Sequence, residues 1–427
     1  MSPLYSFHLQ VDSFDDSELN AARGNPHLYR AVIRSLHRPL SVLATNLSSL
    51  LLPLLAAPGF LNPPAPTPAT PLPNAVQNHA LGIAKFAEEL LIAFDQLELG
   101  TDNDARGDGL KSVREGLVSV IQKVTTPLVT GIRNELLPLI EALERPAPQV
   151  TPAKGTTATK SAANAIVYHP SIVTLQTLIP LYARALARYT SSATAQATLA
   201  NLLVTALWKS MVALAHRADI APSPPPSPTV GPSGFAKKRR GSPSTTPPAT
   251  PPPSRFMLKL PPSRPASPTP PPVVATAAGD CKALLELLNQ LPRPAPEGSS
   301  QLAREAVDEA FKGLQALAVF LETLQAIHIS LKTPQEQADE LQTLTEELPT
   351  LIALPPLLRM YAAGSLPPVS EITGLSEEDY RRSCLSGFGR AEEVASVVGQ
   401  RVQQRLHDNP NANQVLCKWL DLEMDLT

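Results

Sequence analysis

Apolar residues recur three and four positions apart along most of the chain, the spacing that places them on one face of an α-helix. The first run is Leu36, Leu40, Leu43, Leu47, Leu50 and Leu54. Later runs predict helices over residues 75–99, 110–144, 168–190 and 193–218, and then over 280–290, 300–331 and 390–407. Pro127 and Pro138 should kink or split the helix over 110–144, because proline lacks a backbone N–H donor and its ring clashes with the preceding turn.

Two further helix starts are indicated by side chains that can accept hydrogen bonds from the unpaired backbone amides of the first helical turn. Thr333-Pro334-Gln335-Glu336 has the form of a capping box with proline at the first helical position, and Ser376-Glu377-Glu378-Asp379 is a similar start. Alternating β-branched runs are nearly absent, and no repeat of fixed period is visible. The sequence therefore predicts an all-α fold built from helical bundles.

A proline-rich segment interrupts this pattern. Residues 221–272, called the arm below, hold 19 of the 47 prolines, carry seven Lys or Arg and contain no acid. Because so few large apolar residues cannot offset the entropy of ordering a chain, we expect the arm to be disordered. A chain of 427 residues favours two lobes. We expect an N-terminal bundle over 1–220, with a proline-rich loop at 58–74 and a Thr/Ala-rich loop at 146–163, a linker over 221–279, and a C-terminal bundle over 280–427. The sequence does not say whether the lobes touch.

Composition and motifs narrow the classes of function. The net charge of −2 and the aromatic share of 4% argue against nucleic-acid binding. Phosphate-loop, dinucleotide, zinc-protease, hydrolase and kinase motifs are all missing, and the cysteines and histidines lack metal-ligand spacing. We therefore assign no catalytic, cofactor-binding or metal-binding residue, infer no small-molecule substrate and favour a protein that is not an enzyme. An enzyme with a site assembled between helices stays open, because such sites leave no local motif.

Residues 40–61 carry no charge and approach the length of a membrane-spanning helix. Polar residues and two prolines dilute this stretch, and the leucine stripe through it is typical of a soluble helix packed on partners. We therefore expect no integral membrane segment. The stripe can close within one chain or pair two copies as a homodimer, and spacing does not choose between these.

The arm holds the most specific signals. Lys237-Lys238-Arg239-Arg240 resembles a run that nuclear import receptors bind, although it could be only a solubilising cluster. Proline follows seven candidate phosphorylation sites for a proline-directed kinase, namely Ser223, Ser227, Ser242, Thr246, Thr250, Ser267 and Thr269. Four phosphates at about −1.5 to −2 each would cancel the arm's positive charge. Any linker rich in Pro, Ser and Thr contains some such pairs by chance.

Two segments are candidate partner-binding peptides. Arg255-Phe256-Met257-Leu258-Lys259-Leu260 joins basic residues to apolar Phe256, Leu258 and Leu260, as kinase-docking peptides do, or is only incidentally apolar. The end of the chain alternates acids with Trp419, Leu420, Leu422, Met424 and Leu426. That tail can enter a groove on a partner, or it can pack onto its own bundle, which we favour.

Together these features predict a helical scaffold, adaptor or regulatory protein of signalling, cell-cycle or transcription machinery. Its bundles would bind protein partners, and phosphorylation of the arm would regulate it in the cytoplasm and nucleus. A peripheral adaptor of membrane traffic or the cytoskeleton is the main alternative.

Overall fold

The computed structural model describes residues 25–100, 110–147, 167–217, 275–296, 300–326, 333–362, 366–408 and 413–426. Helices and their connections make up these ranges, and no strand occurs in them. The all-α prediction is therefore confirmed for this part of the chain.

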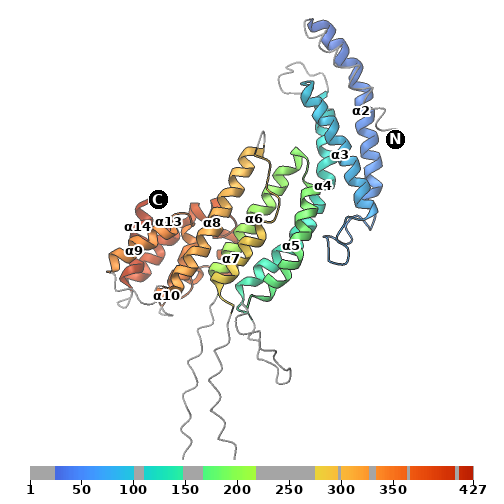
Figure 1. Cartoon of the computed structure of the whole chain (residues 1–427). Helices are drawn as coiled ribbons and strands as arrows, with labels where there is room; N and C mark the ends of the chain where they lie inside the picture. Colours follow the sequence, from blue (N-terminus) through green and yellow to red (C-terminus); the bar gives the residue numbers. More distant parts are fainter. Residues whose placement is uncertain are drawn as a thin grey trace, which may run out of the picture.

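The helices before the arm are α2 (Pro26–Ala56), α3 (Ala75–Gln96), α4 (Leu110–Glu141), α5 (Pro170–Tyr189) and α6 (Gln196–His216), with 3₁₀ turns η1 (Ala142–Glu144) and η2 (Ala193–Ala195). Those after it are α7 (Ala277–Leu288), α8 (Gln301–Ala326), α9 (Pro334–Thr345), α10 (Thr350–Ala362), α11 (Val369–Ile372), α12 (Glu377–Cys384), α13 (Phe388–His407) and α14 (Gln414–Leu426). Figure 1 shows them as an elongated array, with α2 and α3 at one end, α6 and α8 in the middle, and α9 and α14 at the other end.

Helices on the two sides of the arm pack directly against each other. α6 lies against α8 and α10, and α5 lies against α7. The fully buried Leu207 and Met211 of α6 and Leu314 and Leu317 of α8 belong to one continuous apolar core. The question of whether the two parts touch is thus answered, while their division into two lobes stays a prediction. The helix after the arm begins at Ala277, three residues earlier than the boundary we predicted.

Prolines interrupt the helices less than the sequence suggested. We predicted that Pro127 and Pro138 would kink or split α4; it runs unbroken through both, so the split does not occur. The helix is packed along its length against α2, α3, α5 and α6, and burial of its apolar face stabilises it where single backbone hydrogen bonds are lost. Both predicted helix starts are confirmed. The amide of Thr333 donates to Glu336 (2.9 Å), and the hydroxyl of Ser376 accepts from the amide of Asp379 (3.1 Å).

The buried face of α2 is rotated from the leucine stripe. Ile33 and Leu51, which lie outside the stripe, are each only 1% exposed, whereas Leu50 within it is 61% exposed. Leu47 is buried, and the other stripe residues are half-buried. The apolar arc of α2 is wider than the surface that α3 and α4 cover, so spacing alone could not identify the buried edge.

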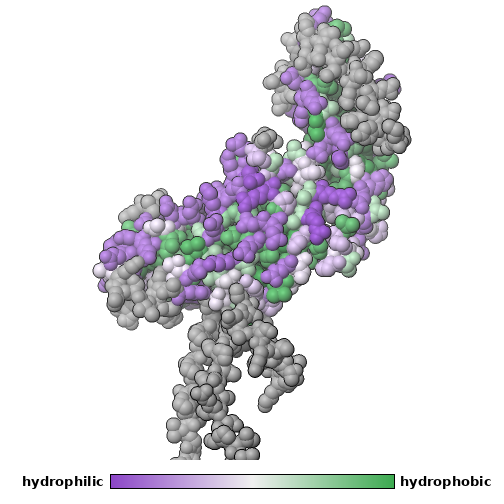
Figure 2. Space-filling model, viewed as in Figure 1, coloured by the Kyte–Doolittle hydropathy of each residue, from purple (hydrophilic) through white to green (hydrophobic). Residues whose placement is uncertain are grey.

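Charged and polar side chains dominate the helix surfaces on the face shown in Figure 2, with apolar residues visible in narrow bands between them. This pattern matches helices that bury one stripe and solvate the opposite face.

The proline-rich loop after α2 is fastened across α3 and α4. Gln77 of α3 donates to the carbonyl of the buried Phe60 (2.9 Å). A Cβ placed on Gly131 of α4 would lie 1.9 Å from the carbonyl oxygen of Pro64. Glycine at 131 is therefore required by the close approach of the two backbones.

Gly131→Ala should lower the free energy of unfolding by at least about 1–3 kcal/mol, because the clash is with backbone that cannot rotate away. Gly116→Ala is the matched control on the same helix. Its Cβ would meet nothing closer than Ala44 Cβ at 4.0 Å, so it should stabilise the protein by up to about 1 kcal/mol. Urea unfolding of both variants checks this, and equal effects at the two positions would contradict it.

Candidate functional site

The signals in the arm lie outside the described residues. These are the basic run at 237–240, the seven Ser-Pro and Thr-Pro sites and the docking peptide at 255–260. The structure instead describes where the arm's two ends are attached to the helical body.

A buried ion pair joins those ends. Arg217, directly after α6, donates to Asp280 in the first turn of α7 at 2.5 Å, and the two side chains are 2% and 1% exposed. Arg217 also donates to the carbonyl of Ala275 at 3.1 Å. The residues that flank 218–274 therefore lie together at one place on the body, which we call the arm root (Arg217, Ala275 and Asp280).

The arm root also holds a third segment of chain. The second carboxylate oxygen of Asp280 accepts from the backbone amide of His169 at 3.0 Å. The imidazole Nδ1 of His169 in turn accepts from Ser171 (3.1 Å) and so caps α5. Burial, together with the nearby positive charge of Arg217, lowers the pKa of His169, which favours the neutral ring that this cap requires.

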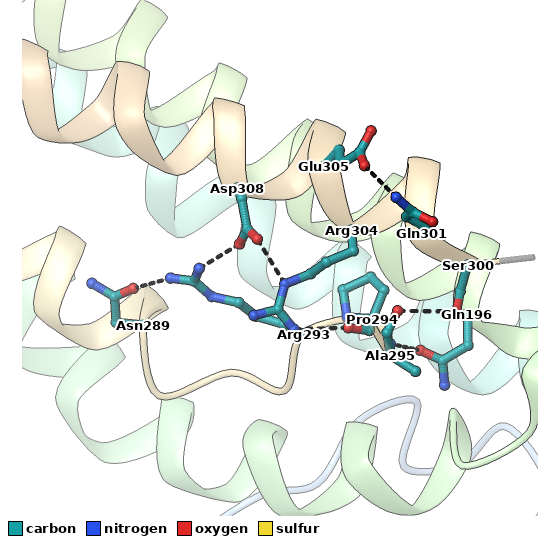
Figure 3. A network of polar contacts seen from close by, with 10 residues as sticks. All are labelled: Gln196, Asn289, Arg293, Pro294, Ala295, Ser300, Gln301, Arg304, Glu305 and Asp308. Carbon is teal, nitrogen blue, oxygen red and sulfur yellow. Dashed lines mark hydrogen bonds and ion pairs between the residues drawn. The ribbon is translucent and has the colours of Figure 1, made fainter. Parts of the chain in front are cut away.

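A second polar network ties the same helices together elsewhere (Figure 3). Gln196, at the start of α6, accepts from the backbone amide of Ala295 in the α7–α8 connection at 3.1 Å. Arg293 and Arg304 both donate to Asp308 of α8, at 2.5 and 2.8 Å. Burial acts to raise the pKa of Asp308, but the two guanidinium groups outweigh it and lower the value. This network therefore adds a polar contact between the two halves of the chain, away from the arm root.

The candidate tail motif is part of the body. Trp419 and Leu420 of α14 are fully buried, and the Trp419 indole donates to Thr345 of α9 at 3.1 Å. Leu422 and Met424 are half-buried, while the side chain of Leu426 lies outside the described residues. The tail therefore packs onto its own bundle in the structure, and binding of this motif to a partner would require α14 to detach.

A cleft of about 320 Å³ lies beside the arm root. We call it the seam groove, because it is lined by residues from both sides of the arm: Glu144, His216, Pro355, Leu358, Arg359, Leu366, Pro367, Pro368, Val369, Ser370, Glu377, Tyr380 and Arg381. A second cleft, of about 590 Å³, adjoins it across Glu144 and Arg381, which line both. His216 directly precedes Arg217, so the arm root and the seam groove are neighbours.

An ion-pair network forms one wall of the seam groove. Arg381 donates to both carboxylate oxygens of Glu144 (2.5 and 2.7 Å) and to Glu377 (2.7 Å). Burial acts to raise the pKa of Glu377, but its bonds with Arg381 and Ser370 outweigh that and lower it. The charges of this wall are therefore already matched to one another.

Two buried polar atoms of the groove have no hydrogen-bond partner among the described residues. They are Nε2 of His216 and the hydroxyl of Tyr380. Burial lowers the pKa of His216 and raises that of Tyr380, so both side chains are held neutral near pH 7. Buried polar atoms without partners are rare in folded proteins, because each forgoes its hydration.

Two described helical stretches are long and apolar enough to span a membrane by length and composition, His27–Ala56 and Ala193–His216. The second includes α6 and has 67% of its apolar window buried, as expected for a core helix, but the first has only 11% buried. The exposed face of α2 includes Leu28, Val42, Leu50 and Leu52, each at least half exposed.

No cluster of three or more candidate metal-binding side chains occurs in the part of the chain that the structure describes. Comparisons with family models, with curated proteins and with solved structures found no match. The function of the chain therefore has to be inferred from its own sequence and structure.

Sequence analysis missed the residues that matter most at this site. Neither Arg217 nor Asp280 belongs to a motif recognised in the sequence. A signal for one of them was present, since Asp280 is the first acid after the acid-free arm. His216 and Tyr380 carried no local signal, because 164 positions separate residues that share one cleft.

Asp280→Ala should lower the free energy of unfolding by about 3–5 kcal/mol, because Arg217 would stay buried without its partner. Lys282→Ala is the control on the same helix, since the Lys282–Glu322 pair is about half exposed. It should cost about 1 kcal/mol or less. Denaturant titration of the full chain measures both, and similar small losses would show that the arm root does not stabilise the fold.

Proposed function

We propose that this chain is a non-enzymatic helical scaffold or adaptor that binds protein partners and displays a regulated basic arm. The observation that carries the proposal is the arm root. Because Arg217 contacts both Ala275 and Asp280, the two attachment points of the arm lie side by side on a packed body. Phosphorylation of the arm would therefore change which partners the arm meets, with little effect on how the helices on either side are spaced.

The charge of the arm supports this role. It carries +7 within a chain of net charge −2, so the remainder carries −9. Phosphorylation by a proline-directed kinase would remove that contrast and place negative charge beside the import-like run at 237–240. We propose on this basis a cytoplasmic and nuclear protein of signalling, cell-cycle or transcription machinery.

Quantitative mass spectrometry of what co-purifies from the protein's own cells tests this. Three forms should be compared: the intact chain, a chain with residues 218–274 replaced by a short Gly/Ser connector, and one with the seven Ser-Pro and Thr-Pro acceptors changed to alanine. We expect a near-stoichiometric partner that is lost or changed when the arm is removed. Thermal unfolding should be nearly the same in all three, because the arm root closes without the arm.

Recovery of the chain alone, with an unmodified arm and with no difference among the three forms, would contradict the proposal. Nuclear exclusion under all conditions, combined with an arm that is never phosphorylated, would contradict its regulatory part.

The exposed α2 helix favours a second candidate, a peripheral adaptor at membranes. α2 contains no acid, and Arg30, Arg34 and Arg38 follow one another at four-residue spacing before an uncharged apolar stretch. A helix with basic residues at one end and exposed leucines suits an anionic lipid surface.

If this second candidate is right, the chain should co-sediment with phosphatidylcholine/phosphatidylserine vesicles and stay bound through a high-salt wash. The Leu50→Asp/Leu52→Asp double variant should then be released, because it removes exposed apolar surface from α2. Val173→Asp/Leu302→Asp is the matched control on α5 and α8, with side chains at least as exposed overall (51% and 77%). Failure to sediment, or complete release by salt, would exclude this candidate.

A further inference from the structure

The seam groove is lined by apolar residues together with a few polar side chains, the usual composition of a binding cleft. Its apolar lining comes from α10 and from the segment before α11, and includes Pro355, Leu358 and Leu366. Its volume of about 320 Å³ is near the lower end of the ~300–1,000 Å³ range of ligand pockets, so it suits a short apolar segment.

The unpaired atoms define the hydrogen bonds available to an occupant that reaches them. Nδ1 of His216 lies 2.9 Å from the carbonyl of Val212, so in the neutral ring it carries the proton and donates. Nε2 is then an acceptor that needs a donor. The hydroxyl of Tyr380 can donate in turn, and Tyr380 is only 1% exposed. The backbone of a peptide offers both complements, N–H groups and C=O groups.

The charged groups of the groove exclude a strongly charged occupant. Glu144 and Glu377 are both bound by Arg381, and Arg359 donates to the carbonyl of Ala215 at 2.6 Å. The two acids and two arginines balance, and His216 is neutral. An added charge in the cleft would lose its hydration without gaining a free counter-charge.

We propose that the seam groove is the peptide-binding site of this scaffold, and that its occupant is an uncharged, extended apolar segment of a partner protein. An apolar side chain lies against Leu358 and Leu366, while backbone N–H and C=O groups of the segment bond to His216 and Tyr380. This inference depends on the proposed function, since it names the surface through which the body holds a partner beside the arm.

An array of short acetylated and amidated peptides tests the proposal with purified full-length protein. The array is built from Ala, Leu, Val, Pro and Ser, and each peptide has counterparts with one Asp or Lys. We expect the uncharged members to be retained and the charged counterparts to bind less. For the best peptide, Tyr380→Phe should weaken binding about two- to tenfold through the loss of one hydrogen bond, and Leu366→Trp should abolish it by filling the cleft.

Tyr361→Phe is the matched control, because the Tyr361 hydroxyl is also buried without a described partner but does not line the groove. Both Phe variants should unfold like the unchanged chain, and Tyr361→Phe should bind like it. Retention of no uncharged peptide, or equal binding by the two Phe variants, would overturn the proposal. Binding seen only after the arm is replaced by a connector would show that the arm, and not a partner, occupies the groove.

The two proposals fail in different ways. If the co-purifying partner is kept by both Tyr380→Phe and Leu366→Trp, the scaffold function stands and the seam groove is not its site. If no partner co-purifies but the uncharged peptides bind with the expected variant pattern, the groove stands and the scaffold function does not.

Discussion

The buried contact between Arg217 and Asp280 is the constraint on which the arrangement of the two halves depends. Removing two charges from water costs several kcal/mol per ion, so such a pair persists only when its geometry is good and its remaining polar atoms are bonded. Here the guanidinium also binds Ala275, and the carboxylate also accepts from His169. One carboxylate thus fixes the end of α6, the start of α7 and the start of α5 relative to one another.

Because of this constraint, the arm does not set the distance between the helices before it and those after it. A linker between separate lobes would set their distance, whereas a segment closed at its root can vary in charge and partners while the helices keep their packing. The Gln196 network fixes the same helices at a second place, and the apolar contact between α6 and α8 lies in the shared core. The seam groove exists only because the parts before and after the arm meet, which places this cleft next to the attachment points of the arm.

Local sequence patterns predicted the helices well, because three- and four-residue spacing and capping side chains act within a few residues. The box at Thr333 and the start at Ser376 are examples. Local sequence patterns gave the wrong result where packing against neighbouring helices determines which residues are buried and whether a helix continues. Leu50 is exposed and Ile33 buried because the packing of α3 and α4 selects part of the apolar arc of α2. Pro127 did not split α4, because tertiary packing offsets one missing hydrogen bond. The arm root and the groove could not be predicted, since Glu144, His216 and Tyr380 meet only through the fold.

The central claim is that the helices before and after the arm form one body held at the arm root. This body should stay together even when the arm is cut. The most direct measurement is to insert a protease site in the arm, cut it completely, and determine the mass of the native product by light scattering. The account predicts that the two fragments stay together with the mass of the uncut chain and separate only on denaturation. Two separately eluting fragments under native conditions would contradict it.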